Sequence, residues 1–179
     1  MSKIFSKTIL LSAVTSIIFI FSCEKSEPNT VIKTIISPIP DTVKDDFQKD
    51  VLVELNKLRA KGCECKSTTQ SQIFPPQALL DWDDLLAKTA SKHSQDMYFN
   101  KYLSHTSLTG TDVVQRAKVQ GFVGNVVGEN LANDYFTVAD VMKAWVTSYS
   151  HCTTMMNPDA RILGVAKYQS KWTMVLGVK

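Results

Sequence analysis

The sequence lacks a strong excess of one charge, an internal repeat and any low-complexity tract. Its 179 residues carry a formal net charge of +3 at pH 7, which is not the basic excess that marks a nucleic-acid-binding protein. The apolar run at residues 8–21 is 14 residues long, shorter than the ~20 residues of a permanent membrane-spanning helix. These absences predict no nucleic-acid partner and argue against a transmembrane protein.

The first 22 residues have the pattern of a secretory signal peptide. Lys3 and Lys7 precede the apolar run, and Cys23 follows it in the stretch IFSC, which resembles a bacterial lipobox. We therefore expect export, cleavage before Cys23 and lipidation of its sulfur. The mature chain would then lie in the cell envelope, anchored to a bacterial membrane on the periplasmic face or at the cell surface. The alternative is cleavage nearby that leaves Cys23 as an ordinary thiol.

Cleavage would leave a short tether and one domain. It removes two lysines and no acidic residue, so the net charge falls to near +1. Residues 23–44 contain Pro28, Pro38 and Pro40 and show no helical period, which predicts a tether able to reach up to ~60 Å from the lipid when extended. Residues 45–179 suffice for a single domain with a substantial core.

Two helices are expected before residue 101. The first has Phe47, Val51, Leu55 and Leu58 on one face and stops at Gly62. Near its end, the basic group Lys57, Arg59 and Lys61 is interpreted as a solvated helix end. The second helix is expected to begin at Asp81 or Asp83 and to end near Asn100, with Leu86, Ala90, His93 and Met97 sharing one face.

The rest of the chain predicts two more helices and a terminal hairpin. A short helix is expected from an N-cap at Thr111 to Gly121, and a fourth from Thr137 through Tyr149. Residues 162–168 and 172–178 have the β-rich pattern of two hairpin strands, and residues 121–131 contain a further candidate strand. Residues 63–76 are interpreted as a polar loop. Helices ahead of a hairpin predict an α+β fold.

Six stretches carry a family resemblance. They are LLDWDDLLAKTASKHSQDM, LSHTSLTGTDVVQRAKVQGF, VGENLAND, AWVTSYSHCTTMMNP, RILGVAKY and WTMVLGV. In this order they resemble the bacterial branch of the CAP superfamily, also called SCP-like or cysteine-rich secretory, antigen 5 and pathogenesis-related proteins. The resemblance implies a three-layer α-β-α sandwich with a small central antiparallel sheet over residues 45–179, an extracellular setting and a cleft where histidines and a glutamate meet.

The resemblance assigns three residues to that cleft: His105 in LSHT, Glu129 in VGEN and His151 in SYSHC. Two imidazoles and a carboxylate are suitable Zn²⁺ ligands, so we expect a divalent cation as the one candidate cofactor. Many members carry a second glutamate on the helix where this chain has Ser148, which we place in the cleft. The sequence assigns no catalytic residue. The alternative is that the three residues form a hydrogen-bonded structural cluster. His93 lies on an apolar helical face and is interpreted as a buried core histidine.

Three cysteines remain when Cys23 is lipidated. In an exported protein we expect a disulfide between Cys152 and either Cys63 or Cys65, because a bridge between Cys63 and Cys65 would close a very small ring. The sequence does not decide between the two partners. The alternatives are three reduced thiols, or zinc held by the cysteines together with His151.

Two functions from different classes follow from the resemblance, which implies no single activity. The first is a binding module whose cleft takes a divalent cation, a small amphipathic ligand such as a lipid, a glycan or a protein partner. The second is a hydrolase in which Glu129 and the histidines activate water, directly or through a metal, or in which a histidine activates Ser148 or Ser150. The binding module is preferred because no Gly-x-Ser-x-Gly or His-Glu-x-x-His signature occurs.

Overall fold

The structure is a computed structural model that describes residues 45–179. The predicted signal peptide, the lipidation site at Cys23 and the tether lie outside these residues. Within the described part of the chain, no helix is both long enough and apolar enough to cross a membrane.

A four-stranded sheet forms the middle layer of the domain. Its strands are β3 (Asp81–Trp82), β4 (Asn125–Ala132), β5 (Ile162–Tyr168) and β6 (Lys171–Val178), arranged in the order β3-β5-β6-β4. The predicted terminal hairpin is confirmed as β5 and β6, and the further candidate strand is β4, which pairs with β6 antiparallel. The two-residue β3 pairs with β5 in parallel, so the sheet is antiparallel except at that edge.

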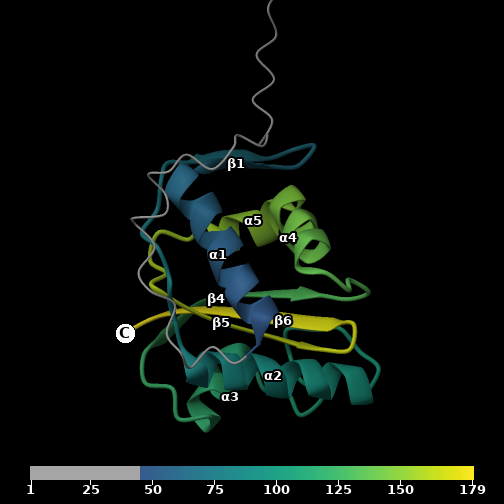
Figure 1. The fold of residues 1–179 in the computed structure, drawn as a ribbon. Coiled ribbons are helices and arrows are strands. Elements are labelled where there is room, and N and C mark those ends of the chain that lie inside the picture. The colour runs from purple at the N-terminus through teal and green to yellow at the C-terminus, as the bar shows by residue number, and fades with distance from the viewer. Residues whose placement is uncertain (1–44) are drawn as a thin grey trace, which may run out of the picture.

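Helices cover both faces of this sheet. Figure 1 shows α2 (Asp84–Phe99) and α3 (Val113–Val119) on one face. On the other face lie α1 (Asp46–Lys61), α4 (Val138–Thr147) and α5 (Tyr149–Met155). This arrangement confirms the predicted α+β class and the three-layer sandwich.

Alternation along the central strand divides the core in two. In β6, Met174 and Leu176 pack with residues of α1 and α4, while Val175 between them packs with residues of α2 and α3. Successive side chains of a strand point to opposite faces, so one strand supplies both halves of the core. The sheet therefore holds the helical layers in fixed positions on either side of it.

Two predicted helix ends are confirmed and one is shifted. Gly62 has a φ of 73° and ends α1, because glycine adopts this left-handed conformation without a Cβ penalty. The side chain of Asp83 accepts a hydrogen bond from the Leu86 amide and caps α2. For α3 the cap is Asp112 rather than Thr111, because Asp112 forms a reciprocal capping box with Gln115.

Three further predictions are wrong. The fourth helix stops at Ser148, whose ψ of 122° is extended, and α5 begins after it. The segment expected as a polar loop contains an antiparallel hairpin of β1 (Cys63–Lys66) and β2 (Ser71–Phe74). Arg59 is not part of a solvated helix end, because it is 0% exposed. Its guanidinium donates hydrogen bonds to the backbone carbonyls of residues 78, 155, 157 and 160.

Candidate functional site

The three residues assigned to the cleft come from three different elements. His105 lies in the loop between α2 and α3, Glu129 lies in β4 at an edge of the sheet, and His151 lies in α5. They are separated by more than 20 positions each, so only the layered fold places them near one another. The site therefore forms where the two helical layers meet the β4 edge.

Glu129 is buried and uses both carboxylate oxygens. Its Oε2 accepts a hydrogen bond from His105 Nδ1 at 2.8 Å, and its Oε1 accepts one from Arg116 Nη2 at 2.7 Å. The Glu129 side chain is 3% exposed, whereas that of His105 is 62% exposed. Glu129 therefore holds the His105 ring through Nδ1, while most of the His105 side chain is exposed to solvent.

Arg116 is a site residue that the sequence prediction missed. Its side chain is 9% exposed, and Nη1 donates to the backbone carbonyls of His105 and Thr111, both at 2.9 Å. Arg116 thus holds the loop that carries His105 while it pairs with Glu129. The available signal was its place in VVQRA, within the stretch that carries the family resemblance, but nothing in that pattern specifies its partner.

The two cleft histidines have pKa values that are shifted in opposite directions. The hydrogen bond that His105 donates to Glu129 is the main cause that raises the pKa of His105. Burial, followed by the positive charge of His105, lowers the pKa of His151. The effect of the His105 charge on His151 places the two rings within electrostatic range of each other. His151 is also held through its backbone carbonyl, which accepts from Asn130 Nδ2 at 3.0 Å.

The cleft residues do not form a closed three-ligand cage. Across residues 45–179, the group of three or more metal-ligating side chains whose ligand atoms all lie within 4.8 Å consists of three cysteines, and His105, Glu129 and His151 are not part of it. The donor types still suit a cation, since imidazole nitrogens bind Zn²⁺ and the carboxylate behind His105 fixes the ring. A metal at this site stays a prediction.

Ser148 has no histidine partner in the described part of the chain. Its hydroxyl contacts the Ser150 hydroxyl at 3.4 Å. An activated serine requires a base within hydrogen-bond distance, about 2.6–3.2 Å. The described geometry therefore gives no support to a serine nucleophile, and a Glu129–His105 pair acting on water is the arrangement left to the hydrolase hypothesis.

His93 is the buried core histidine that the sequence predicts. It is 1% exposed, and its Nε2 donates to the Ser104 carbonyl at 2.8 Å. Among residues 45–179, its buried Nδ1 finds no hydrogen-bond partner. Burial is the main cause that lowers the pKa of His93, and the Arg116 charge acts in the same direction.

This environment predicts acid sensitivity that depends on His93. Because the pKa of His93 is lowered in the folded state, the unfolded chain binds the proton more tightly than the folded chain does. The neutral His93 side chain therefore contributes its full stability above pH ~6.5, and this contribution is lost as the pH falls through the folded-state pKa. His93→Gln, which keeps a donor near the Nε2 position and does not titrate, should lose less stability between pH 7 and pH 5 than the wild type. Urea unfolding at both pH values measures this difference. Equal losses in the two proteins would contradict the prediction.

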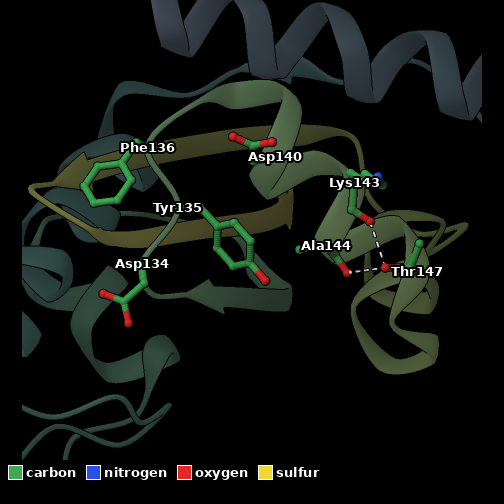
Figure 2. A pocket seen from close by; sticks show the side chains of 7 residues that line it. All are labelled: Asp134, Tyr135, Phe136, Asp140, Lys143, Ala144 and Thr147. Carbon is green, nitrogen blue, oxygen red and sulfur yellow. Dashed lines mark hydrogen bonds between the residues drawn. The ribbon is translucent and has the colours of Figure 1, made fainter.

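A groove lies beside α4, as Figure 2 shows. It has a volume of about 410 Å³. One side is formed by Asp134, Tyr135 and Phe136 from the loop after β4, and the other by four residues of α4: Asp140, Lys143, Ala144 and Thr147. His105, Glu129, Ser148 and His151 do not line this groove. It is therefore a second surface, with aromatic and charged side chains, separate from the histidine pair.

The disulfide joins Cys65 to Cys152 and so links β1 to α5. Cys63, which the sequence left as an equal candidate, is also buried, with its Sγ 3.6 Å from the Cys152 Sγ. Residues 63 and 65 both face α5 because they alternate with exposed Glu64 along β1. A bridge at this place fixes the hairpin over the helix that carries His151.

Comparisons with known proteins agree with this fold. The model of the CAP cysteine-rich secretory protein family matches residues 54–176. The chain is 34% identical over 96 residues to the protein YkwD of Bacillus subtilis, which covers 52% of this chain and 37% of that protein. It is 31% identical over 96 residues to the Bacillus subtilis membrane protein YlbC, covering 54% of this chain and 28% of that protein. The chain thus spans about a third of the length of these relatives.

Two solved structures share the architecture. An extracellular protein from Bacillus anthracis that contains an SCP domain superposes with a TM-score of 0.65 at 24% identity, covering 86% of this chain and 45% of that one. An outer surface protein from Borrelia burgdorferi superposes with a TM-score of 0.61 at 24% identity, covering 73% of this chain and 91% of that one. At this identity the likeness concerns the fold alone.

Proposed function

The chain belongs to the CAP cysteine-rich secretory protein family, and on that premise we propose that it is an exported, lipid-anchored binding module. Its primary ligand is a divalent cation of the Zn²⁺ type, bound by imidazole nitrogens of His105 and His151. The two similar structures are those of an extracellular protein and an outer surface protein, which supports an envelope location. The groove beside α4 would take a second, amphipathic ligand such as a lipid or glycan, or a protein partner.

This proposal rests on the two hydrogen bonds that the Glu129 carboxylate accepts. One oxygen of Glu129 accepts from Arg116 and the other from His105. We therefore propose that Glu129 supports the metal-binding residue His105 and does not contact the metal itself. A carboxylate that accepts from one imidazole nitrogen orients the ring and raises the basicity of the other nitrogen. Two histidines leave coordination positions for water or for a bound ligand, which fits a module that binds through its metal.

Metal titration tests the proposal. We expect about one Zn²⁺ per chain, and Glu129→Gln should weaken binding by about 10–100-fold while leaving the fold intact. His151→Ala should remove most of the affinity because it deletes a ligand. Glu54→Gln, on an exposed face of α1, is the matched control and should bind like the wild type. Isothermal titration calorimetry of the four proteins measures these differences.

The pH dependence of binding has a defined sign. Protons compete with the metal for imidazole nitrogens, so affinity should fall as pH decreases through the histidine range near ~6.5. The raised pKa of His105 starts this competition at a higher pH than for an ordinary histidine. Glu129→Gln removes the main cause of the raised pKa and should move the onset to lower pH. Equal affinities in all variants, or no heat on adding metal, would assign the three residues to a structural cluster.

The anchor is tested separately. Cys23→Ala removes the thiol that the lipid would modify, so the variant should either be released in soluble form or accumulate as an uncleaved precursor. Metabolic labelling of the native chain with a fatty acid should be positive and should be lost in the variant. A native chain that takes up no label would contradict the lipid anchor without affecting the cation site.

The Glu129–His105 pair also supports a second candidate function. An imidazole held by a buried carboxylate is a suitable general base, and it could activate water for hydrolysis. Under this alternative, Glu129→Gln abolishes hydrolysis of a substrate without changing metal affinity. This alternative has no serine nucleophile, because Ser148 and Ser150 contact each other rather than a histidine.

A further inference from the structure

Three cysteine sulfurs meet beneath the β1–β2 hairpin, in a group that does not include His105, Glu129 or His151. Cys63 and Cys65 come from β1 and Cys152 from α5, and all three are buried. Figure 1 shows this hairpin, labelled at β1, at one end of the domain next to α1 and α5. Phe74, Met156, Leu58 and Tyr149 surround the sulfurs. The functional proposal for the histidine cleft does not use this cluster.

The Cys63 sulfur lies close to both sulfurs of the Cys65–Cys152 disulfide. Cys63 Sγ lies 3.6 Å from Cys152 Sγ and 3.9 Å from Cys65 Sγ. Three thiolates that share one metal at about 2.3 Å each lie about 3.8–4.0 Å from one another, by simple triangular geometry. The 3.9 Å side of the sulfur triangle thus already has the length of a three-thiolate metal site, and the 3.6 Å side is slightly shorter. Only the bonded pair, Cys65 and Cys152, has to separate.

We propose that the reduced form of this trio is a binding site for one Cu⁺ ion, and that the Cys65–Cys152 disulfide is the closed, oxidised form of the site. A dithiol reductant would transfer two hydrogens to the disulfide, giving the Cys65 and Cys152 thiols and the oxidised disulfide of the reductant. Cu⁺ then replaces the thiol protons, which pass to solvent, and forms three copper–sulfur bonds with no change in oxidation state.

The surroundings favour Cu⁺ over Zn²⁺. Structural zinc sites almost always have four protein ligands, and the group of mutually close ligating side chains in residues 45–179 has three members. Soft thiolate and thioether groups select Cu⁺, and the neighbouring Met156 is 0% exposed and belongs to the same cluster. His151 follows Ser150 and precedes Cys152 in sequence but is not in this group, so the copper site and the histidine cleft are distinct.

Copper competition on the full chain tests the proposal. Cys23→Ser is the background, because the sequence has four cysteines and this change leaves only the trio. After reduction with a phosphine under anaerobic conditions, the chain should withdraw one Cu⁺ from the chelator bathocuproine disulfonate, and its melting temperature should rise. The oxidised chain should withdraw none. Cys63→Ser should weaken copper binding by about 100-fold, since one of three ligands is lost.

Cys63→Ser also provides the folding control. Its Cys65–Cys152 disulfide should still form on oxidation, and an unchanged circular dichroism spectrum of that oxidised form would show that the variant folds. Copper binding that is equally tight in Cys63→Ser, or equally tight in the oxidised chain, would overturn the proposal. Binding without a rise in melting temperature would assign the copper to unfolded chains and would also overturn it. A preference for Zn²⁺ with the same dependence on Cys63 would overturn the choice of metal.

Discussion

Replacing Gly164 with alanine is expected to lower the free energy of unfolding by about 3 kcal/mol or more. Gly164 lies in β5, where α2 packs directly on the strand. A Cβ at this position would lie 2.1 Å from the Ala87 amide nitrogen and 2.2 Å from the Leu86 carbonyl carbon. Both atoms belong to the backbone of α2, so no side-chain rotation relieves the contact. The helix would have to move away from the sheet, which would open the core half that contains Val175.

Gly128→Ala is the matched control for this prediction. Gly128 lies in β4 of the same sheet, which β6 separates from β5, and a Cβ there would meet the Thr154 Cγ2 at 2.6 Å. Rotating Thr154 relieves this contact at the cost of the hydrogen bond from its hydroxyl to the Ser150 carbonyl, about 1 kcal/mol, so this variant should lose less stability than Gly164→Ala. Chemical denaturation of both variants measures the difference. A Gly164→Ala protein as stable as Gly128→Ala would show that α2 does not pack as closely as described.

Replacing Arg59 with methionine is expected to cost about 4 kcal/mol of stability. Its guanidinium donates to the carbonyls of Ala78, Met155, Asn157 and Ala160 at 2.7–3.2 Å. These carbonyls belong to separate segments that meet at the end of α1. Methionine would fill much of the volume but would leave the buried acceptors without donors, and each such loss costs about 1–3 kcal/mol. Burial, then the charge of Arg161, lowers the pKa of Arg59 to about 10, which leaves it charged at neutral pH.

Arg59→Lys separates the role of charge from that of shape. Lysine keeps the positive charge but cannot reach four acceptors with a rigid planar fork, so we expect a loss of about 2 kcal/mol. Lys57→Met, at an exposed position of the same helix, should change stability by less than about 0.5 kcal/mol. Urea unfolding of the three variants provides the comparison. If Arg59→Met and Lys57→Met lose the same amount, the carbonyl contacts contribute nothing measurable.

The helices that were predicted well are those whose local signals agree. Asp83 caps α2 and Asn100 ends it, and the apolar face of Leu86, Ala90 and Met97 is fully buried. A cap and a period of 3.6 residues are properties of neighbouring residues, so they can be seen in the sequence. The same holds for β6, where alternating residues fill both halves of the core.

The predictions that failed depend on contacts between distant segments. Arg59 has the composition of a solvated helix end, but its acceptors lie up to 101 positions away. The β1–β2 hairpin has a polar sequence whose inward positions are cysteines, and it forms because these pack against α5. The break at Ser148 was hidden because the helical spacing of apolar residues continues from Trp145 to Tyr149. Such features follow from the tertiary fold and not from local propensity.

In the candidate site, too, local motifs identified the residues but not their tertiary contacts. Residues His105, Glu129 and His151 were named from short motifs, and the structure places them on three elements around the β4 edge. The role of Glu129 as the partner of His105 and Arg116 was not accessible, because a motif identifies a carboxylate but not which atoms its oxygens contact. The choice between Cys63 and Cys65 was open for a similar reason, since both face α5 from one strand.

The segment between α2 and α3 has a fixed backbone, which affects the entropy of ligand binding at His105. It is held from both sides, since His93 donates to the Ser104 carbonyl and Arg116 donates to the carbonyls of His105 and Thr111. A ligand that contacts His105 therefore meets a segment whose backbone is already fixed, and its association does not have to include the entropy loss of ordering a loop. Affinity at this position would be set mainly by the groups in contact, and dissociation by how fast those contacts break.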